Sequence, residues 1–354
     1  MENYNSLIKY LLDKRCILSK KQSRVFMVKR IEFIDLAKGI CILMVILGHV
    51  GVPIEILGLK VVRMPLYFIL SGLFYKDYGG LRNLIIKKIN KLLIPFVFFY
   101  SVSYVLFYLI AWIMPNLKYT AATGILDVFF QDHYYNGPIW FLLALFWCNL
   151  FCYFIHFVTK KVIFRILGIL IMGGIGCWLG KMHIFLPCKL DSALTAMPFF
   201  YFGYMLKSTS LLYSNKFDRY WFLCILGLWG GACVGEIVFD TPIFKFSHND
   251  VLGNPFYIYP LSIIEVLSLM LLCKKIKNLP FISYFGRYSI IPLCLHILIY
   301  RPIVLFVNLL GVEKGEHIIE SLIVIFLCWI AIPICIRFLP YVTAQKDLIL
   351  VDKE

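Results

Sequence analysis

Long apolar runs alternate with short polar or Pro- and Gly-containing breaks along most of the chain. Most runs reach the ~17–25 residues that a helix needs to span a bilayer. The pattern therefore predicts an all-α, polytopic membrane protein with about ten transmembrane helices. The expected spans are 33–52, 61–76, 92–114, 138–158, 162–180, 190–207, 219–238, 255–273, 288–310 and 317–338.

The span at 61–76 is unusually short. A helix from Val61 to Tyr75 would be ~22 Å long, whereas the hydrocarbon core of a bilayer is ~30 Å thick. We expect this helix either to lie sunk within the protein or to dip its outer end into the membrane. A dipped end would let water or a substrate reach the end of the first span.

The composition agrees with lipid as the solvent. The 354 residues are 61% hydrophobic and 16% charged, whereas soluble domains have ~45–50% apolar and ~25% charged residues. The net charge of +15 is not a nucleic-acid signature here, because the cations cluster between apolar runs rather than on one soluble face. The 12 cysteines lie almost all in apolar runs, which indicates small core side chains; no metal site is predicted.

Basic residues recur at every second break, as in cytoplasmic loops of membrane proteins. We therefore expect both termini in the cytoplasm. Residues 1–29 would form a basic cytoplasmic arm, 30–340 the transmembrane domain and 341–354 a cytoplasmic tail. Between the spans, the cations of these breaks are Lys76, Arg82, Lys87, Lys88, Lys91, Lys160, Lys161, Arg165, Lys207, Lys216, Arg219, Lys274, Lys275, Lys277 and Arg287.

The first span carries Asp35 and Lys38 in its first turns and His49 near its far end. In a helix all three share one side, with Lys38 ~17 Å from His49 along the axis. Ionisable groups at membrane depth are expensive, and histidine is suited to carry a proton near neutral pH. His49 is therefore a functional candidate; the alternative is an imidazole hydrogen-bonded to a neighbouring helix. Asp35 and Lys38 are either functional or local anchors of the helix end.

Further ionisable residues fall within other spans. Glu265 lies near the middle of its span, so a helix end does not account for it. His296 is either a site residue or an interhelical hydrogen-bonding group. Arg63 either holds an anionic or hydroxylated ligand or extends to the outer face.

Seven short motifs follow one another along the chain in a fixed order. They are Phe33-Ile-Asp35-Leu-Ala-Lys38-Gly39 with Leu47-Gly48-His49, Met64-Pro65-Leu66-Tyr67-Phe68-Ile69-Leu70-Ser71-Gly72, Lys91-Leu-Leu-Ile-Pro95, Gly137-Pro138-Ile139-Trp140-Phe141-Leu142, Asp191, Pro198-Phe-Phe-Tyr201-Phe-Gly203-Tyr, and Gly286-Arg-Tyr-Ser289 with Leu295-His296. Taken together they are similar to the acyltransferase 3 family of integral-membrane O-acyltransferases, most closely to its branch of fucose 4-O-acetylase-like sugar acetyltransferases. In two respects the chain departs from the family pattern: Arg63 stands where a histidine is expected, and lysines replace arginines before the third span.

The resemblance implies an acyltransferase for groups other than aminoacyl groups, specifically an O-acetyltransferase. Its acyl donor would be acetyl-CoA or a related acyl-CoA. Its acceptor would be a hydroxyl of a bacterial cell-surface glycan or of a lipid-linked precursor, in a bacterial inner or plasma membrane. His49 would be the base that activates the hydroxyl. Its acidic partner would be Asp35, Glu265 or Asp191, of which Asp35 is too far along the helix for direct contact.

The remaining candidates each have a plainer alternative. Arg30, Lys87, Lys88 and Lys91 could bind the phosphates of CoA, or they are ordinary topogenic charges. Trp140 could stack on a sugar or belong to an interfacial aromatic belt. Ser71 lines the site, or Ser71-Gly72 permits close helix packing. The expected substrate-binding set is Arg63, Ser71, Trp140, Asp191 and His296.

Two other classes of function compete with this interpretation. A glycan transporter or flippase would move its substrate without covalent catalysis. Transporters often contain internal repeats, and the sequence has none that we can detect. A structural or sensory membrane protein would not need His49.

Overall fold

The computed structural model describes residues 31–52, 61–113, 135–209, 212, 218–239, 244–309 and 317–350. The predicted basic arm at 1–29 and Arg30 lie outside this part of the chain. Each expected span contains one α-helix, so the apolar pattern located these helices correctly. They are α2 (Glu32–Val50), α3 (Arg63–Leu73), α5 (Ile94–Ile113), α6 (Trp140–Val158), α7 (Val162–Lys181), α8 (Leu190–Leu206), α9 (Asp218–Phe239), α10 (Pro255–Ile276), α12 (Ile290–Leu309) and α13 (His317–Phe338).

Shorter elements join them. Helix α4 (Leu81–Lys88) continues through a π-helical turn, Ile89–Leu93, into α5, and α11 (Pro280–Arg287) precedes α12. Strands β1 (Phe244–Lys245) and β2 (Asp250–Val251) form an antiparallel hairpin between α9 and α10, in which Phe244 pairs with Val251. The hairpin lies on the start of α8, because the Ser192 hydroxyl donates to the Phe246 carbonyl at 2.7 Å.

Seven helical stretches in the described chain are long and apolar enough to cross a membrane. The protein is therefore a mostly helical, multi-pass membrane protein. The stretches are Glu32–Val50, Leu81–Trp112, Gly137–Val158, Val162–Lys181, Pro255–Ile276, Ile290–Val307 and His317–Phe338.

The outward faces of the helices are apolar, as a lipid environment requires. On α7, Leu170 and Ile171 are exposed, and on α13 Leu322 and Phe326 are exposed. A soluble protein rarely leaves so many large apolar side chains on one surface. Only 28% of the most apolar stretch of α7 is buried inside the protein, so most of this helix faces outwards.

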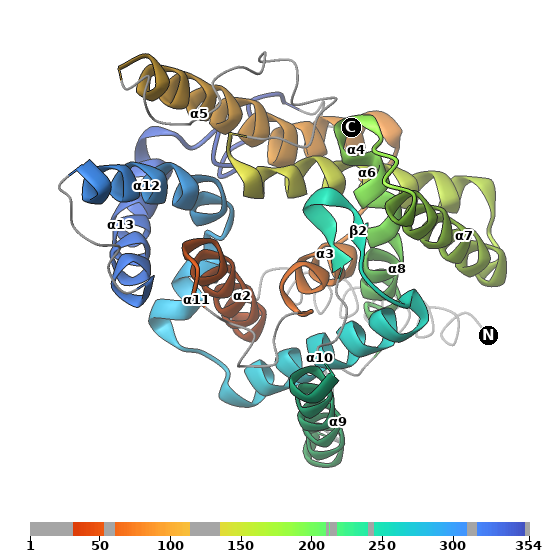
Figure 1. Ribbon diagram of the computed structural model, residues 1–354. Helices are drawn as coiled ribbons and strands as arrows, with labels where there is room; N and C mark the ends of the chain where they lie inside the picture. Colours follow the sequence, from red (N-terminus) through yellow and green to blue (C-terminus); the bar gives the residue numbers. More distant parts are fainter. Residues whose placement is uncertain are drawn as a thin grey trace, which may run out of the picture.

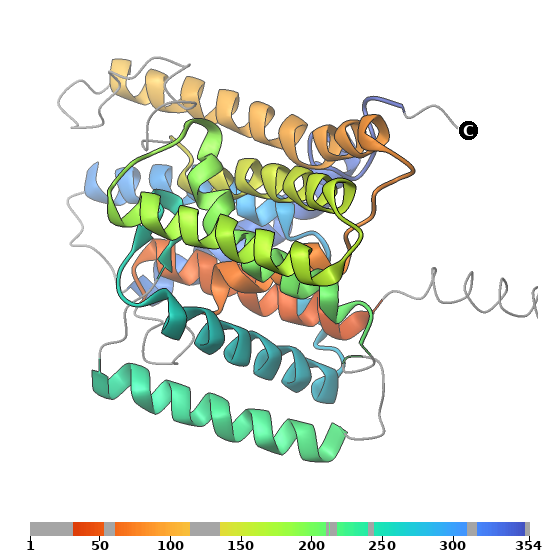
Figure 2. The ribbon, with the colours of Figure 1, turned by 90° about the vertical axis from the view of Figure 1, so that its right-hand side faces the viewer.

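Seen along their axes, the helices form a ring, with α2 and α3 lying towards its inside and α9 outermost against α10 (Figure 1). Helix α2 contacts α3, α10, α11, α12 and α13. The start of α2 and the C-terminal segment lie on the same side of the ring (Figure 2). We call this side the terminal face and the side where α2 ends the opposite face, which Figure 1 views.

Two glycine-mediated contacts bring helices unusually close together. A methyl group on Gly72 would collide with the Phe200 carbonyl of α8, and one on Gly203 with the Ile69 carbonyl of α3. Helices α2 and α11 meet in the same way: a methyl group on Gly39 would collide with the Ile282 carbonyl of α11, and one on Gly286 with the Asp35 carbonyl of α2. Small residues allow such backbone approach in membrane helices, so the Ser71-Gly72 dipeptide has a packing role.

Candidate active site

Helix α2 is unbroken from Glu32 to Val50, and this fixes where its ionisable residues lie. His49 is at the end of the helix on the opposite face, just before Gly51, whose φ of 103° ends the helix. Asp35 is fourteen positions earlier, or ~21 Å along the axis. Asp35 therefore cannot contact His49, although it shares the same helix.

The ring of His49 lies beside that of His296 from α12, with 5.1 Å between the ring centroids. Nδ1 of His49 is 2.8 Å from the Val45 carbonyl, and Nδ1 of His296 is 2.7 Å from the Pro292 carbonyl. Because a carbonyl only accepts, both Nδ1 atoms carry the proton when the rings are neutral. Each Nε2 is then a hydrogen-bond acceptor and a potential base.

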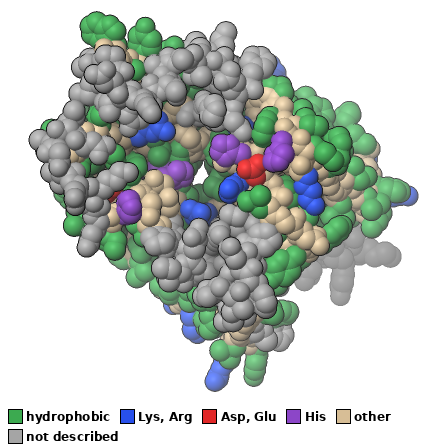
Figure 3. Space-filling model, viewed as in Figure 1, with side chains coloured by type: hydrophobic (Ala, Val, Ile, Leu, Met, Phe, Trp, Pro, Cys, Tyr) green, Lys and Arg blue, Asp and Glu red, His purple; other side chains and the backbone are tan. Residues whose placement is uncertain are grey.

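The two histidines differ in their access to solvent. His49 is exposed although its helix lies inside the ring, whereas His296 is fully buried at 0%. Nε2 of His296 is buried and has no hydrogen-bond partner among the described residues. The opposite face is hollowed at its centre, with histidine, cationic and acidic side chains around the hollow and apolar side chains further out (Figure 3).

The short helix α3 starts well below the end of α2. The Cys41 thiol donates to the Arg63 carbonyl at 2.9 Å, and Cys41 lies ~12 Å along α2 from His49. Helix α3 thus starts inside the bundle, which favours the first of the two arrangements expected from its length, a helix sunk within the protein. Arg63, its first residue, lies near enough for its positive charge to act on His49.

Asn136 is a polar residue near this site that sequence reasoning missed. It is fully buried, and its amide donates to the Cys294 carbonyl at 2.7 Å and to the Ser103 hydroxyl at 3.2 Å. Its side-chain oxygen has no partner in the described ranges. Cys294 lies two residues before His296 on α12. The Asn-Gly-Pro sequence is a turn signal, so nothing in it indicated a buried polar group.

Trp140 is part of the core. The residue is 5% exposed, and its ring packs edge-on against Phe141. The turn before it packs against α5, because Asn136 contacts Ser103 halfway along that helix. This burial favours a packing role for Trp140 over stacking on a sugar, and its place in an interfacial aromatic belt stays a prediction.

The remaining site candidates lie on three different helices. Glu265 is fully buried near the middle of α10, which packs against α2. Asp191 is buried at the start of α8, beside the β-hairpin. Ser71 is half-buried in α3 next to the glycine contact with α8. In the described part of the chain, no three His, Cys, Asp or Glu side chains converge as metal ligands do.

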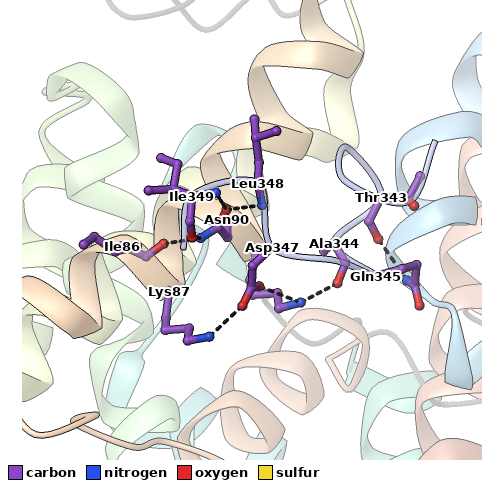
Figure 4. A network of polar contacts seen from close by, with 10 residues as sticks. Ile86, Lys87, Asn90, Thr343, Ala344, Gln345, Asp347, Leu348 and Ile349 are labelled. Atoms are coloured by element: carbon purple, nitrogen blue, oxygen red, sulfur yellow. Dashed lines mark hydrogen bonds and ion pairs between the residues drawn. The ribbon is translucent and has the colours of Figure 1, made fainter. Parts of the chain in front are cut away.

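The three lysines expected to bind the acyl-CoA donor have different partners in the structure. Lys87 and Lys91 both bind the carboxylate of Asp347, at 2.6 and 3.2 Å, and Lys91 also donates to the Ala344 carbonyl at 2.7 Å (Figure 4). The hydrogen bond from Lys87 and the charge of Lys91 hold the pKa of Asp347 below its ordinary value. Lys88 points elsewhere, 5.9 Å from the Tyr78 ring centroid.

Asn90 completes this contact with the C-terminal segment. Its amide donates to the Ile349 carbonyl at 2.8 Å, and its oxygen accepts from the backbone amides of Leu348 and Ile349 (Figure 4). Asn90 is fully buried in the π-helical turn between α4 and α5. The described part of the predicted cytoplasmic tail, residues 341–350, is therefore docked on the terminal face.

Comparison with known families agrees with this arrangement. A family model described as "Acyltransferase domain", that of the acyltransferase 3 family, matches residues 31–339. No curated protein and no solved structure matches the chain significantly. The match covers the whole helical ring, including both histidines, and the chain belongs to the acyltransferase 3 family of membrane acyltransferases.

Proposed function

We propose that this protein transfers an acetyl or similar acyl group from an acyl-CoA to a hydroxyl of a bacterial cell-surface glycan or its lipid-linked precursor. It would belong to the fucose 4-O-acetylase-like branch of the family. The observation that carries the proposal is the accessible Nε2 of His49, whose proton-acceptor state is fixed by the bond to Val45. A hydroxyl is a weak nucleophile and gains from such a base.

The reaction balances with His49 as the proton carrier. The hydroxyl proton passes to Nε2 of His49 while the hydroxyl oxygen bonds to the thioester carbonyl carbon. The carbon–sulfur bond then breaks, and the CoA thiolate takes the proton back from the imidazolium. The charge of Arg63, which acts on His49, would stabilise the oxyanion formed in between.

His296 is the proposed partner of His49 in place of a carboxylate. Its Nε2 can accept a hydrogen bond from the acceptor hydroxyl or from the protonated His49 ring, since its own proton is held at Nδ1. Glu265 and Asp191 remain proposals as acidic partners. Asp35 is not proposed as an acidic partner, because ~21 Å of helix separates it from His49.

We further propose ten crossings of a bacterial cell membrane, with the terminal face in the cytoplasm and the hollow open to the outside. The basic residues at alternate breaks support this orientation. Acyl-CoA would then approach from the terminal face and the glycan from the hollow. Both would meet at the His49–His296 pair.

The test is transfer of labelled acetyl from acetyl-CoA to glycan in membranes containing the protein. His49→Ala should lower the rate by ~10²–10⁴-fold, the usual contribution of a general base. His183→Ala is the matched control, because His183 is an exposed histidine on a different helix end, with its Nδ1 3.8 Å from the carboxylate of Asp250. Both variants should reach wild-type levels in the membrane.

Two outcomes would contradict the proposal. Wild-type transfer by His49→Ala would remove the catalytic assignment. Glycan translocation without any acetyl transfer by the wild type would favour the transporter instead.

A further inference from the structure

Lys88 separates from its neighbours: it lies 5.9 Å from the Tyr78 ring centroid, on helix α4, which packs against α6. Lys87 and Lys91 are neutralised by Asp347. Lys88 follows Lys87 by ~100° around the helix, is half-buried and has no carboxylate partner among the described residues. Its charge, with that of Arg165, acts on Cys152 near the end of α6.

Four aromatic side chains gather one turn beyond Cys152. The His156 ring is 4.7 Å from the Tyr204 ring and 5.9 Å from the Tyr201 ring, centroid to centroid. The Tyr75 ring lies 6.3 Å from His156 with only 21° between the two planes. We call Tyr75, His156, Tyr201 and Tyr204 the aromatic cluster. They come from just after α3, from α6 and from α8.

The aromatic cluster contains two buried polar atoms that have no hydrogen-bond partner among the described residues. Nδ1 of His156 is 2.6 Å from the Cys152 carbonyl, so the proton is on Nδ1 and Nε2 is an acceptor. That Nε2 is buried and without a partner, and so is the Tyr75 hydroxyl, as far as the described chain shows. Buried polar groups are nearly always hydrogen-bonded, so two together indicate a missing donor and acceptor.

Cations surround the aromatic cluster. Arg165 hydrogen-bonds Tyr201 and donates from Nε to the Thr159 carbonyl at 2.7 Å. Lys207 donates to the Tyr75 carbonyl at 3.2 Å. Asp77, an exposed residue, is the carboxylate whose charge reaches Tyr75 and His156. With Lys88, the balance of charge is positive and suits phosphate groups.

We infer that the aromatic cluster and Lys88 bind the adenine nucleotide end of the acyl-CoA donor. An adenine offers an amino donor beside a ring-nitrogen acceptor, which matches Nε2 of His156 and the Tyr75 hydroxyl. Aromatic faces stack on any nucleobase, and the cations face its phosphates. The inference rests on the proposed function for the identity of the donor, and it moves the donor site from Lys87 and Lys91 to Lys88.

The experiment measures binding of adenosine 3′,5′-bisphosphate to the detergent-purified protein by calorimetry. Tyr75→Phe and Lys88→Gln should each weaken binding by ~5- to 10-fold, as loss of one hydrogen bond or charge contact does. Tyr284→Phe and Lys87→Gln are the matched controls, since Tyr284 belongs to α11 and Lys87 is held by Asp347. Both controls should bind as the wild type does.

A second readout separates binding from structure. Tyr75→Phe removes a hydroxyl that has no partner in the described part of the chain, so the thermal midpoint of the nucleotide-free protein should not fall. Unchanged affinity in Tyr75→Phe and Lys88→Gln, or an equal loss in Lys87→Gln, would overturn the inference.

Acetyl transfer distinguishes this failure from failure of the proposed function. If Tyr75→Phe and Lys88→Gln transfer acetyl with an unaltered KM for acetyl-CoA, the proposed acyltransferase activity stands and the proposed nucleotide site is contradicted. If the two variants lose nucleotide binding as expected but the wild type transfers no acetyl group, the nucleotide site stands and the proposed acyltransferase activity is contradicted.

Discussion

The imidazole of His49 is held by one bond to its own helix, and that bond decides what the ring can do. With Nδ1 committed to the Val45 carbonyl, only Nε2 is available to take a proton. The same commitment in His296 prevents the two neutral rings from hydrogen-bonding to each other, since both Nε2 atoms are acceptors. A hydroxyl group placed between them would supply the missing proton.

This pairing predicts a kinetic role for His296. In His296→Leu the protonated His49 ring loses an acceptor, and a hydrogen bond to a charged group is worth ~1.5–3 kcal/mol. We therefore expect kcat for acyl transfer to fall by ~10- to 150-fold, with the KM for acyl-CoA nearly unchanged. Steady-state kinetics in detergent checks this, with thermal unfolding as the control for folding. A normal kcat in a folded His296→Leu protein would exclude the pairing.

The sequence identified His49, His296 and Arg63 separately as candidates, but it did not show that they lie together and it missed Asn136. A charged or titratable group at membrane depth is visible in a hydropathy pattern, and His49 was one. Asn136 is not visible, because Asn-Gly-Pro is typical of an exposed turn. The proximity of His296 to His49 depends on where α12 packs, and helices separated by more than 200 positions leave no periodic signal.

At the scale of the helices, the close glycine contacts explain why two of the sequence motifs each contain a glycine. Gly72 and Gly203 lie in two separate motifs of the sequence, yet each is in contact with the other's helix. A sequence pattern gives the position of each glycine but not its partner. The existence of the helices was predictable from apolar length, whereas their pairing required the three-dimensional contacts.

The docking of the C-terminal segment was not predictable for a related reason. Asn90 binds the backbone amides of Leu348 and Ile349, which any sequence offers. Asp347 is one of three acidic residues in the predicted tail, with Asp352 and Glu354, and any of them had side-chain chemistry that suited the lysines at 87 and 91. A pattern of residue types could not select Asp347 as their partner.

This contact should depend on pH. The pKa of Asp347 is lowered in the folded protein by its bond to Lys87 and by Lys91. Its stabilisation is therefore present above the ordinary carboxyl pKa of ~4 and lost as the pH falls through the lower folded value. Hydrogen exchange of the Leu348 and Ile349 amides, corrected for intrinsic rates, should lose protection below about pH 4.

Two variants make the pH experiment decisive. Asp347→Asn should exchange these amides faster already at pH 7, because the ion pairs are gone. Asp77→Asn, an exposed acid in the turn before α4, should exchange as the wild type does. Equal protection in Asp347→Asn and wild type would show that the lysines do not hold the segment.

The proposed orientation of the protein in the membrane can be tested at the two ends of α7. Lys160→Cys precedes this helix and Lys181→Cys ends it, and both positions are exposed. A membrane-impermeant maleimide applied to intact cells should label Lys181→Cys and reach Lys160→Cys only after permeabilisation. Both cysteines are introduced into a Cys188→Ser protein, because Cys188 is a partly exposed free thiol, and this protein without the introduced cysteines gives the background labelling. The reverse labelling would invert the proposed topology.

The hollow on the opposite face also has an electrical consequence. Water in such a hollow would conduct, so a membrane voltage would fall mainly across the layer of protein between its floor and the terminal face. Moving one charge through 100 mV costs about 2.3 kcal/mol. In the proposed reaction the proton passes to His49 and back to the CoA thiolate without a net crossing of the membrane, so this step should be independent of the membrane potential, whereas a charged group entering from the terminal face would experience most of it.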